Sequence, residues 1–389
     1  MASAREARDD TICATPAMID PSRRRMLVIL ATALAACASA VAIDSAAAAP
    51  RHRPGATAAG YAGRRDVRGF IDELVRDDGF SRASLRRWLG DARYQKKIVD
   101  AMQRPLLAPP KWYEYAPRFL NEQRIGAGVE FWRAHEQALD RAEAEFGVPP
   151  EIVVAIVGVE TFYGRNTGGY RVIDALATLA FDYPRRAPYF RNELREFLLF
   201  ARDENLSPLV PRGSFAGAMG LPQFMPGSLR RYAVDFDGDG RIDLWNSGDD
   251  VVGSVANYLA RHDWLRGQPV WARATVAQSQ RDAVIARLDG GISERRPLAA
   301  WNADGVAVEG TADPAVEQPV GLLLLEEGPD PQAGLVADPP QPAQPAESLW
   351  IVYPNFYVIT RYNKSRLYAA AVTSLARELR VAHDANPPP

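Results

Sequence analysis

Apolar residues repeat with a helical period over much of the chain, and this pattern predicts a mainly helical protein. The repeat is present over residues 70–75, 85–89 and 175–201. A longer apolar series over residues 129–146 predicts one extended helix, and residues 368–381 predict an amphipathic helix near the C-terminus. Helices therefore account for most of the predicted fold.

The pattern changes between residues 270 and 325, where valine, alanine and glycine alternate with polar residues. Such alternation favours short strands over helices, and residues 320–325 predict a buried strand. The following residues, 328–347, hold six prolines and are predicted to be a loop. The predicted fold class is therefore mainly α, within the α+β class, with a small strand-rich subdomain.

One of the most apolar helices of the chain ends at an acidic residue. Two prolines, Pro149 and Pro150, mark its start, and residues 152–159 carry no polar side chain. A helix that is apolar on all sides is a buried helix. Glu160 follows directly, and a carboxyl group that loses its hydration tends to keep its proton, so it can act as a general acid. The alternative is that Glu160 caps the helix or pairs with Arg165.

The composition is that of an ordinary globular protein, and it excludes some classes of function. The chain has 389 residues, of which 47% are hydrophobic, and a net charge of −2. This charge gives no electrostatic basis for binding nucleic acid. The histidines show no zinc-ligand spacing, and no organic cofactor is indicated. The two cysteines, Cys13 and Cys37, lie close to the N-terminus, so no disulfide is expected in the folded body.

The N-terminus has the features of an export signal. Consecutive arginines precede an apolar run over residues 28–36 that is too short to span a bilayer. The arginines loosely resemble a twin-arginine signal, with Met26 in place of the usual aromatic residue. The residues that end at Cys37 resemble the lipobox of bacterial lipoproteins, which predicts a lipid on Cys37 and a periplasmic protein anchored to the outer membrane. Cleavage near residues 38–40 or within 46–49 would instead release a soluble periplasmic protein.

Aspartates and glycines between residues 235 and 243 form a pattern typical of an EF-hand-like calcium loop. Oxygen-bearing side chains occupy loop positions 1, 3, 5 and 9, and Gly240 lies at position 6, where a sharp turn is needed. Position 12 is Asn246 instead of glutamate, so a later aspartate must complete the set. Calcium would be structural here, whereas the alternative is an acidic turn that holds no ion. By this spacing Asp235, Asp237, Asp239 and Asp243 offer side-chain oxygens, Arg241 offers its backbone carbonyl, and Asp250 or Asp249 would supply the missing carboxylate.

Four blocks of the sequence resemble the membrane-bound lytic murein transglycosylase B family, which has a lysozyme-like fold. The first, residues 158–164, reads Gly-Val-Glu-Thr-Phe-Tyr-Gly and is similar to the catalytic motif of that family. The others are residues 213–226, the aspartate loop with residues 253–258, and residues 354–369. The blocks occur in the family's order, and the resemblance covers about residues 66–383. The proline-rich insertion has no counterpart in the family pattern.

The resemblance implies an enzyme that cleaves the β-1,4 bond between N-acetylmuramic acid and N-acetylglucosamine in peptidoglycan. The product would carry a 1,6-anhydromuramoyl end. The resemblance also assigns the catalytic acid and base to Glu160, calcium to the aspartate loop, and a lysozyme-like helical core to the fold. The implied substrate-binding residues are Tyr115, Ser214, Gln223, Tyr258, Tyr362, Asn363 and Tyr368.

A single carboxyl group suffices for this reaction if the substrate supplies the nucleophile. Glu160 would protonate the glycosidic oxygen and then accept the proton of the C6 hydroxyl of the sugar. Most glycosidases use two carboxylates, but the matched blocks contain no second acid outside the aspartate loop. The alternatives are a hydrolytic muramidase and a non-catalytic, calcium-stabilised protein that binds peptidoglycan.

The predicted domain organisation follows from these observations. The segments are a signal peptide with lipobox (1–37), a tether (38–65), an N-terminal helical domain (66–140), a lysozyme-like catalytic core with the calcium loop (141–268), a small strand-rich subdomain with the proline-rich insertion (269–347), the C-terminal part of the core (348–383) and a tail (384–389).

Overall fold

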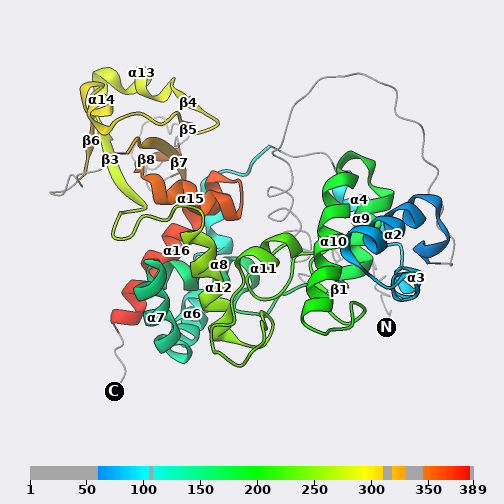
Figure 1. The fold of residues 1–389 in the computed structure, drawn as a ribbon. Helices are drawn as coiled ribbons and strands as arrows, with labels where there is room; N and C mark the ends of the chain where they lie inside the picture. Colours follow the sequence, from blue (N-terminus) through cyan, green and yellow to red (C-terminus); the bar gives the residue numbers. More distant parts are fainter. Residues whose placement is uncertain (1–59, 105–107, 310–317, 330–344, 386–389) are drawn as a thin grey trace, which may run out of the picture.

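The computed structural model describes residues 60–104, 108–309, 318–329 and 345–385. Within these ranges helices predominate, and a small antiparallel sheet forms a lobe at one end of the helical body (Figure 1). The fold is thus mainly helical with a small sheet, as the sequence predicts. Cys37, the predicted signal peptide and residues 330–344 of the proline-rich segment lie outside the described ranges. Of the helices that the structure describes, none is long and apolar enough to cross a membrane.

The N-terminal helices pack against two helices from the middle of the chain (Figure 1). Phe70 contacts Phe181 edge-on, with ring centroids 5.7 Å apart, and the Tyr61 hydroxyl donates to Asp182 at 2.6 Å. Tyr61 is only 4% exposed, so the folded body begins before residue 65, where the tether was predicted to end. The group comprises η1 (Tyr61–Gly63), α2 (Arg65–Asp78), α3 (Arg82–Asp91), α4 (Lys96–Met102), α9 (Val172–Asp182), η3 (Pro184–Arg186) and α10 (Ala187–Asp203).

A second group of helices surrounds α8 (Pro150–Thr161). Helices α6, α7, α12 and α16 all contact it, which explains why residues 152–159 are apolar on every side. The amphipathic helix predicted over residues 368–381 is confirmed as part of α16. The other members are α5 (Trp112–Tyr115), η2 (Ala116–Arg118), α6 (Glu122–Ala134), α7 (Glu136–Phe146), α11 (Pro226–Tyr232), α12 (Gly248–Ala260), α15 (Pro354–Tyr362) and α16 (Arg366–Asp384).

The single helix predicted over residues 129–146 is wrong, because the chain forms two helices, α6 and α7, that meet at His135. The backbone of His135 has φ −126° and ψ 26°, outside the helical region. Its ring Nδ1 lies 2.8 Å from a carboxylate oxygen of Asp249 in α12. The bend lets two short helices pack on α8. The domain boundary predicted after residue 140 therefore falls inside α7, and residues 66–140 divide between the two helical groups.

The strand-rich part is a six-stranded antiparallel sheet in the order β4-β5-β7-β8-β3-β6. A second apolar core that includes Trp301, Leu322 and Tyr353 packs within this lobe. The elements are β3 (Trp271–Val276), η4 (Gln278–Gln280), α13 (Arg281–Ile285), β4 (Leu288–Asp289), β5 (Ile292–Ser293), α14 (Leu298–Ala303), β6 (Val306–Val308), β7 (Gly321–Pro329) and β8 (Pro345–Val352); β1 (Tyr170–Arg171) and β2 (Arg212–Gly213) form a separate two-stranded sheet.

The structure confirms the strand predicted over residues 320–325 and corrects its surroundings. Leu322, Leu323 and Leu325 of β7 are at most 1% exposed. The alternating pattern before them also contains two short helices, α13 and α14, that were not predicted. The proline-rich segment is not a loop throughout, because β7 extends to Pro329 and pairs there with Pro345 of β8. Proline is tolerated at this far end of the hairpin, where the ladder needs no further donor.

Candidate active site

Glu160 lies in the last turn of α8, at the point where the helix is forced to stop. The two residues after Thr161, Phe162 and Tyr163, both have φ of 54°, which lies in the left-handed region and costs about 1–3 kcal/mol for each residue without a glycine. The Tyr163 ring fills the space beside Gly158, where a β-carbon would lie 2.5 Å from the phenol oxygen. Tight packing therefore fixes the backbone directly before and after Glu160.

Two further side chains hold this end of α8. The Thr161 hydroxyl donates to the Leu221 carbonyl at 2.9 Å and accepts the Gly164 amide at 3.1 Å. Arg124 of α6 donates from its guanidinium to the carbonyl of Gly158. Nothing in the sequence pattern singled out Arg124, because its partner is a backbone atom of another helix. Thr161 lies inside the matched motif but was not given a role.

The carboxyl group of Glu160 is partly buried and has one hydrogen-bond donor. The Tyr368 hydroxyl donates to its Oε1 at 2.7 Å. Burial raises the pKa of Glu160 from 4.5 to about 7, and the bond from Tyr368 opposes this rise. Among the described residues Glu160 forms no salt bridge. The guanidinium of Arg165 lies over the Phe162 ring, 4.6 Å from its centroid. The ion pair of Glu160 with Arg165 is therefore not formed.

Four predicted substrate-binding tyrosines surround this carboxyl group. Burial raises the pKa of each of Tyr115, Tyr258, Tyr362 and Tyr368, and the nearby charge of Glu160 adds to the rise in all four. The rings of three of them form a continuous series, with centroids 6.5 Å apart for Tyr362 and Tyr368 and 4.8 Å apart for Tyr258 and Tyr362. Residues that are far apart in the sequence thus meet at one acid.

The hydroxyl groups of these tyrosines have different partners. Tyr258 donates to the Arg361 carbonyl at 2.7 Å, and Tyr362 donates to the Pro222 carbonyl at 2.6 Å. Only the Tyr368 hydroxyl bonds to Glu160. Tyr258 and Tyr368 are also at most 7% exposed. Their rings therefore shield the carboxyl group from water and present little open surface to a sugar ring. Tyr362 is the more exposed of the three.

The three neutral polar residues predicted to bind sugar lie on segments around the end of α8. Gln223 has φ of 52°, and its amide nitrogen donates to the carbonyls of Thr167 and Gly220 at 3.2 and 2.9 Å. Its amide oxygen bonds to no described residue. Ser214 Oγ accepts the Ala218 amide at 3.0 Å, which leaves its proton available to donate. Asn363 directly follows α15 and is 7% exposed. The hydrogen bonds of Ser214 and Gln223 go to backbone atoms and not to the Glu160 carboxyl group.

The aspartate loop brings three carboxylates together. One oxygen each of Asp235, Asp237 and Asp250 lies within 4.8 Å of the others. Such a set of hard oxygen donors fits a cation of the calcium class. Asp239 is not part of this set, and its carboxylate accepts the backbone amide of Arg241 at 2.9 Å. A calcium ion would thus find Asp235, Asp237 and Asp250 already converged.

The structure also decides between the two aspartates proposed to complete the loop. Asp250 is 1% exposed and accepts the backbone amides of Phe236, Asp237 and Asp243. The neighbouring Asp249 instead bonds to His135, away from the converging carboxylates. Asp250 is therefore the residue whose carboxylate lies with those of Asp235 and Asp237.

Comparison with known proteins agrees with this geometry. Residues 62–377 match the family model for the transglycosylase SLT domain. The chain is 40% identical over 348 residues to membrane-bound lytic murein transglycosylase B of Escherichia coli (strain K12), and the match covers 86% of this chain and 88% of that protein.

Solved structures of similar sequence have the same fold. Soluble lytic transglycosylase SltB1 from Pseudomonas aeruginosa is 43% identical, with a TM-score of 0.72 over 82% of this chain and 99% of that one. Escherichia coli Slt35 in complex with calcium is 39% identical, with a TM-score of 0.70 over 82% and 94%. Pseudomonas aeruginosa SltB3 in complex with NAG-anhNAM-pentapeptide is 29% identical, with a TM-score of 0.67 over 81% and 79%.

Proposed function

This chain belongs to the transglycosylase SLT domain family and is a lytic murein transglycosylase, and we propose that Glu160 is its catalytic acid and base. The proposal depends on one observation: among the described residues Glu160 forms no ion pair, the Tyr368 hydroxyl donates to it, and burial raises its pKa to about 7. At that pKa both protonation states are populated near neutral pH, so the group can give a proton and later take one.

The first step is proton donation to the glycosidic oxygen of a glycan strand. Tyr368 donates to Oε1, so the acidic proton of Glu160 resides on Oε2 and is free to reach the leaving oxygen. The breaking bond leaves positive charge on the muramic acid ring, and the sugar's own 2-acetamido group would stabilise it. The same bond from Tyr368 stabilises the carboxylate that remains, because hydrogen bonds to a charged acceptor are the strong ones.

The second step is ring closure by the C6 hydroxyl of the muramic acid. The ionised Glu160 accepts the hydroxyl proton while the oxygen bonds to C1, which forms the 1,6-anhydro product. Ser214, Gln223 and Asn363 suit an uncharged polysaccharide, because a hydroxyl and two amides can bond to sugar without an ionic partner. Tyr115, Tyr258 and Tyr362 would enclose the reacting bond and exclude water, which would otherwise attack C1.

Mass spectrometry of the fragments released from purified sacculi tests this reaction. The expected products end in anhydromuramic acid and are one water lighter than the products of hydrolysis. Glu160→Gln should release neither product while the folded protein still binds the strands. Hydrated ends as the main product would make the enzyme a hydrolytic muramidase instead, and full activity in Glu160→Gln would remove the acid from the mechanism.

We infer further that the aspartate loop binds calcium through Asp235, Asp237, Asp250 and the carbonyl of Arg241, with Asp239 completing the set once the ion is present. The converged carboxylates support this inference, as does the calcium complex of the similar Slt35. Calcium would tie the loop to the start of α12 and has no part in the bond cleavage. Calcium-dependent fluorescence of Trp245, which follows the loop, would report binding; an unchanged signal up to millimolar calcium would contradict it.

We also propose that Cys37 carries the lipid that anchors the protein to the outer membrane from the periplasmic side. The lipobox-like residues before Cys37 support this, together with the membrane-bound name of the Escherichia coli relative. Labelling of cells with an alkyne fatty acid should mark the wild-type protein and leave Cys37→Ser unmarked. Cys13→Ser is the matched control and should stay labelled. Unlabelled wild-type protein in the soluble periplasmic fraction would favour ordinary signal cleavage.

A further inference from the structure

The N-terminal helices carry an excess of exposed positive charge that the proposed reaction does not use. The whole chain has a net charge of −2, yet within residues 60–93 five arginines are exposed and form no salt bridge with a described residue. We call these five residues the basic face. They are Arg65 and Arg68 of α2, Arg86 and Arg87 of α3, and Arg93 of the segment that joins α3 to α4.

The acids close to the basic face are already paired with other arginines. Asp66 pairs with Arg64 at 2.7 Å, and Asp91 pairs with Arg171. Of the acids in α2, α3 and α4, only Glu73 forms no salt bridge with a described residue. Ion pairs therefore neutralise nearly all the negative charge of these helices, and the positive charge of the basic face is left at the surface.

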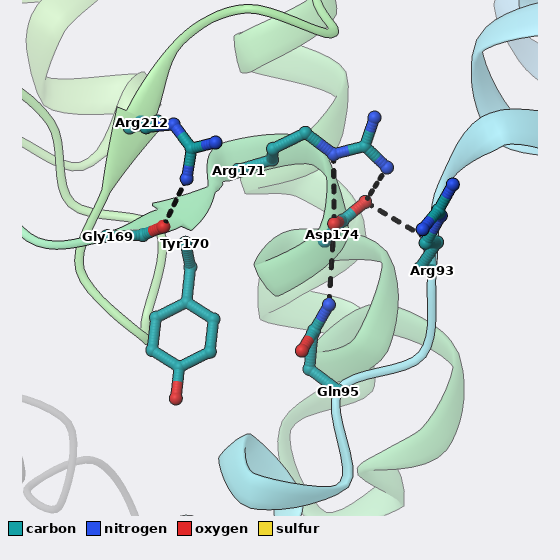
Figure 2. A pocket seen from close by; sticks show the side chains of 7 residues that line it. All are labelled: Arg93, Gln95, Gly169, Tyr170, Arg171, Asp174 and Arg212. Carbon is teal, nitrogen blue, oxygen red and sulfur yellow. Dashed lines mark hydrogen bonds and ion pairs between the residues drawn. The ribbon is translucent and has the colours of Figure 1, made fainter.

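Figure 2 shows how Arg93 keeps its charge although it lies beside an acid. The Asp174 carboxylate accepts from the Arg171 guanidinium at 2.8 Å, from the backbone amide of Arg93 at 3.0 Å and from the Gln95 amide at 3.4 Å. Arg93 thus binds Asp174 through its backbone, and its guanidinium forms no salt bridge with a described residue. The same bonds fix the linker backbone against α9, so the position of Arg93 is set before any partner arrives.

The basic face lies around the point where the described body begins. Gly60 is packed directly against the end of α3, because a β-carbon on it would lie 1.8 Å from the Gly90 carbonyl oxygen. Arg86 and Arg87 precede Gly90 by four and three residues, and this spacing places them on the same side of the helix as Gly90. The first turn of α2, which carries the two other helical arginines, directly follows η1, and η1 contacts α3.

The chain reaches this point from the proposed lipid anchor. Twenty-two residues separate Cys37 from Gly60, so a lipid on Cys37 holds Gly60 within about 80 Å of the membrane, which is the reach of a fully extended chain of this length. A surface that is tethered in this way meets the membrane at a high effective concentration, so contacts that are weak between free molecules are sufficient. The basic face is the part of the described body that lies nearest to the anchor along the chain.

We propose that the basic face docks on the anionic phospholipid headgroups of the membrane that holds the lipid anchor. The inference rests on the proposed anchor at Cys37 and adds to it a fixed orientation of the folded body. The parallel N–H donors of a guanidinium match the oxygens of a phosphate group. Basic residues that are clustered beside a membrane anchor also strengthen binding to anionic lipid.

Docking determines which way the active site faces. Helices α2 and α3 lie at the end of the body that is away from the helices around α8 (Figure 1). With α2 and α3 on the membrane, Glu160 at the end of α8 is held away from the lipid. The groove around Glu160 is then open toward the peptidoglycan instead of the membrane surface.

The test measures how the unlipidated Cys37→Ser chain partitions onto vesicles of phosphatidylethanolamine and phosphatidylglycerol. The triple variant Arg86→Gln, Arg87→Gln, Arg93→Gln in this chain should bind on the order of 100-fold more weakly, about fivefold for each arginine. Lysine at the same three positions should keep the partition within about twofold, because it keeps the charge. All the chains share the same N-terminal residues, so binding by those residues cancels in the comparison. Equal partition of the glutamine variant and its parent would overturn the proposal.

Controls separate loss of charge from loss of fold. Arg377→Gln, at an exposed arginine of α16 that pairs with Glu378 at 3.1 Å, should leave the partition unchanged, whereas Arg87→Gln alone should lower it about fivefold. Thermal melting shows whether the triple variant is folded, and the two single variants decide the question if it is not. Binding of the parent chain should also weaken at 1 M salt, where the Debye length is about 3 Å.

The orientation is measured on the lipid-anchored protein in the same vesicles, in a Cys13→Ser background. A fluorescent thiol label at Ala83→Cys lies one helical turn before Arg86 and Arg87. A second label at Val381→Cys lies on α16, where Val381 is 61% exposed. A nitroxide on the lipid headgroup should quench the first label several times more strongly than the second. Equal quenching of the two labels would mean that the anchored body does not dock, and the proposal would be wrong.

Further outcomes separate this proposal from its alternatives. If the triple variant loses binding to purified sacculi but keeps its partition onto the vesicles, the basic face binds the cell wall and the proposal is wrong. A Cys37 that carries no lipid would contradict the proposed anchor, and the partition of the unlipidated chain would still decide whether the basic face binds anionic lipid. Cleavage of soluble glycan strands needs no membrane, so the triple variant should cleave them as fast as the wild type.

Discussion

Glu160 at the end of α8 and Asp250 in the aspartate loop are both acids removed from bulk water, and burial raises the pKa of each. Their hydrogen-bond partners differ. Asp250 accepts three backbone amides, at 2.7, 3.3 and 2.8 Å, whereas Glu160 accepts one phenol at 2.7 Å. Backbone donors are fixed in place, so the three amides oppose the rise in the pKa of Asp250 and tie loop residues together. A single side-chain donor leaves the carboxyl group able to exchange its proton.

The same chemical group thus serves the structure of the loop at Asp250 and, as proposed, catalysis at Glu160. The number and rigidity of the donors decide the role, because each fixed donor stabilises the ionised state. Around Glu160 lie tyrosine rings, which remove water without supplying charge. Substitution of each acid by its amide should therefore affect activity at Glu160 and stability at Asp250.

Glu160→Gln should lower the rate of strand cleavage by about 1,000-fold, the usual weight of a general acid and base. Release of soluble fragments from labelled sacculi measures it. Glu151→Gln is the matched control: it lies on the same helix, but its carboxylate pairs with Arg380 at 2.6 Å. Comparable losses of rate in the two variants would mean that the substitutions disrupt the helix, and that the loss in Glu160→Gln does not report proton transfer.

Asp250→Asn should lower the free energy of unfolding by about 3 kcal/mol and leave the rate of cleavage per folded molecule nearly unchanged. The reason is that an amide cannot accept three donors as a carboxylate does. Thermal melting with calcium and with a chelator measures both effects, and calcium should raise the melting temperature of the wild type but not that of Asp250→Asn. Asp249→Asn, next along the chain, should keep the calcium response. A calcium response in Asp250→Asn would remove this residue from the ligand set.

The stability of the wild type should fall relative to Glu160→Gln as pH rises from 5 to 8. A pKa that folding raises from 4.5 to about 7 means that the native state holds more protons than the unfolded state between these values. Its stabilising contribution is complete below 4.5 and is lost as pH rises through about 7, by about 3 kcal/mol in total. Urea unfolding of both proteins at the two pH values measures the difference. A constant difference would mean that the Glu160 pKa is ordinary.

Tyr368→Phe should lower the rate about tenfold and shift the alkaline limb of the pH profile upward. The bond from Tyr368 lowers the pKa of Glu160, so its removal lets burial raise that pKa further and keeps the acid protonated to higher pH. The pH dependence of kcat/KM measures it. Tyr258→Phe, whose hydroxyl bonds to the Arg361 carbonyl, should leave the limb in place. A downward shift in Tyr368→Phe would contradict the assigned hydrogen bond.

The smallest effect is expected from Arg165→Gln. Its guanidinium lies on the Phe162 ring and not on Glu160, and such an exposed cation–π contact contributes only about 0.5–1 kcal/mol. The rate and the pH profile should stay within about twofold of the wild type. A large shift of the alkaline limb of the pH profile would mean that Arg165 does form an ion pair with Glu160.

The sequence predicted those parts of the fold in which the pattern of apolar residues is compatible with only one kind of secondary structure. The apolar run of α8, the amphipathic α16 and the leucines of β7 were predicted correctly, because their periodicity depends on local geometry and burial together. The break at His135 was missed, since apolar residues continue on both sides of it and the partner of its ring, Asp249, lies on another helix. The short helices α13 and α14 were hidden by alternation that also suits strands.

By itself the sequence determined that a lone acid ends one of the most apolar helices, that aspartates gather in one loop, and which family the chain resembles. These are properties of neighbours in the chain. The tertiary structure alone decided that Tyr368 reaches Glu160 and that Asp250, not Asp249, lies with the loop carboxylates. Those contacts join residues from separate helices and strands, and their distances depend on how the elements pack, which local patterns do not encode.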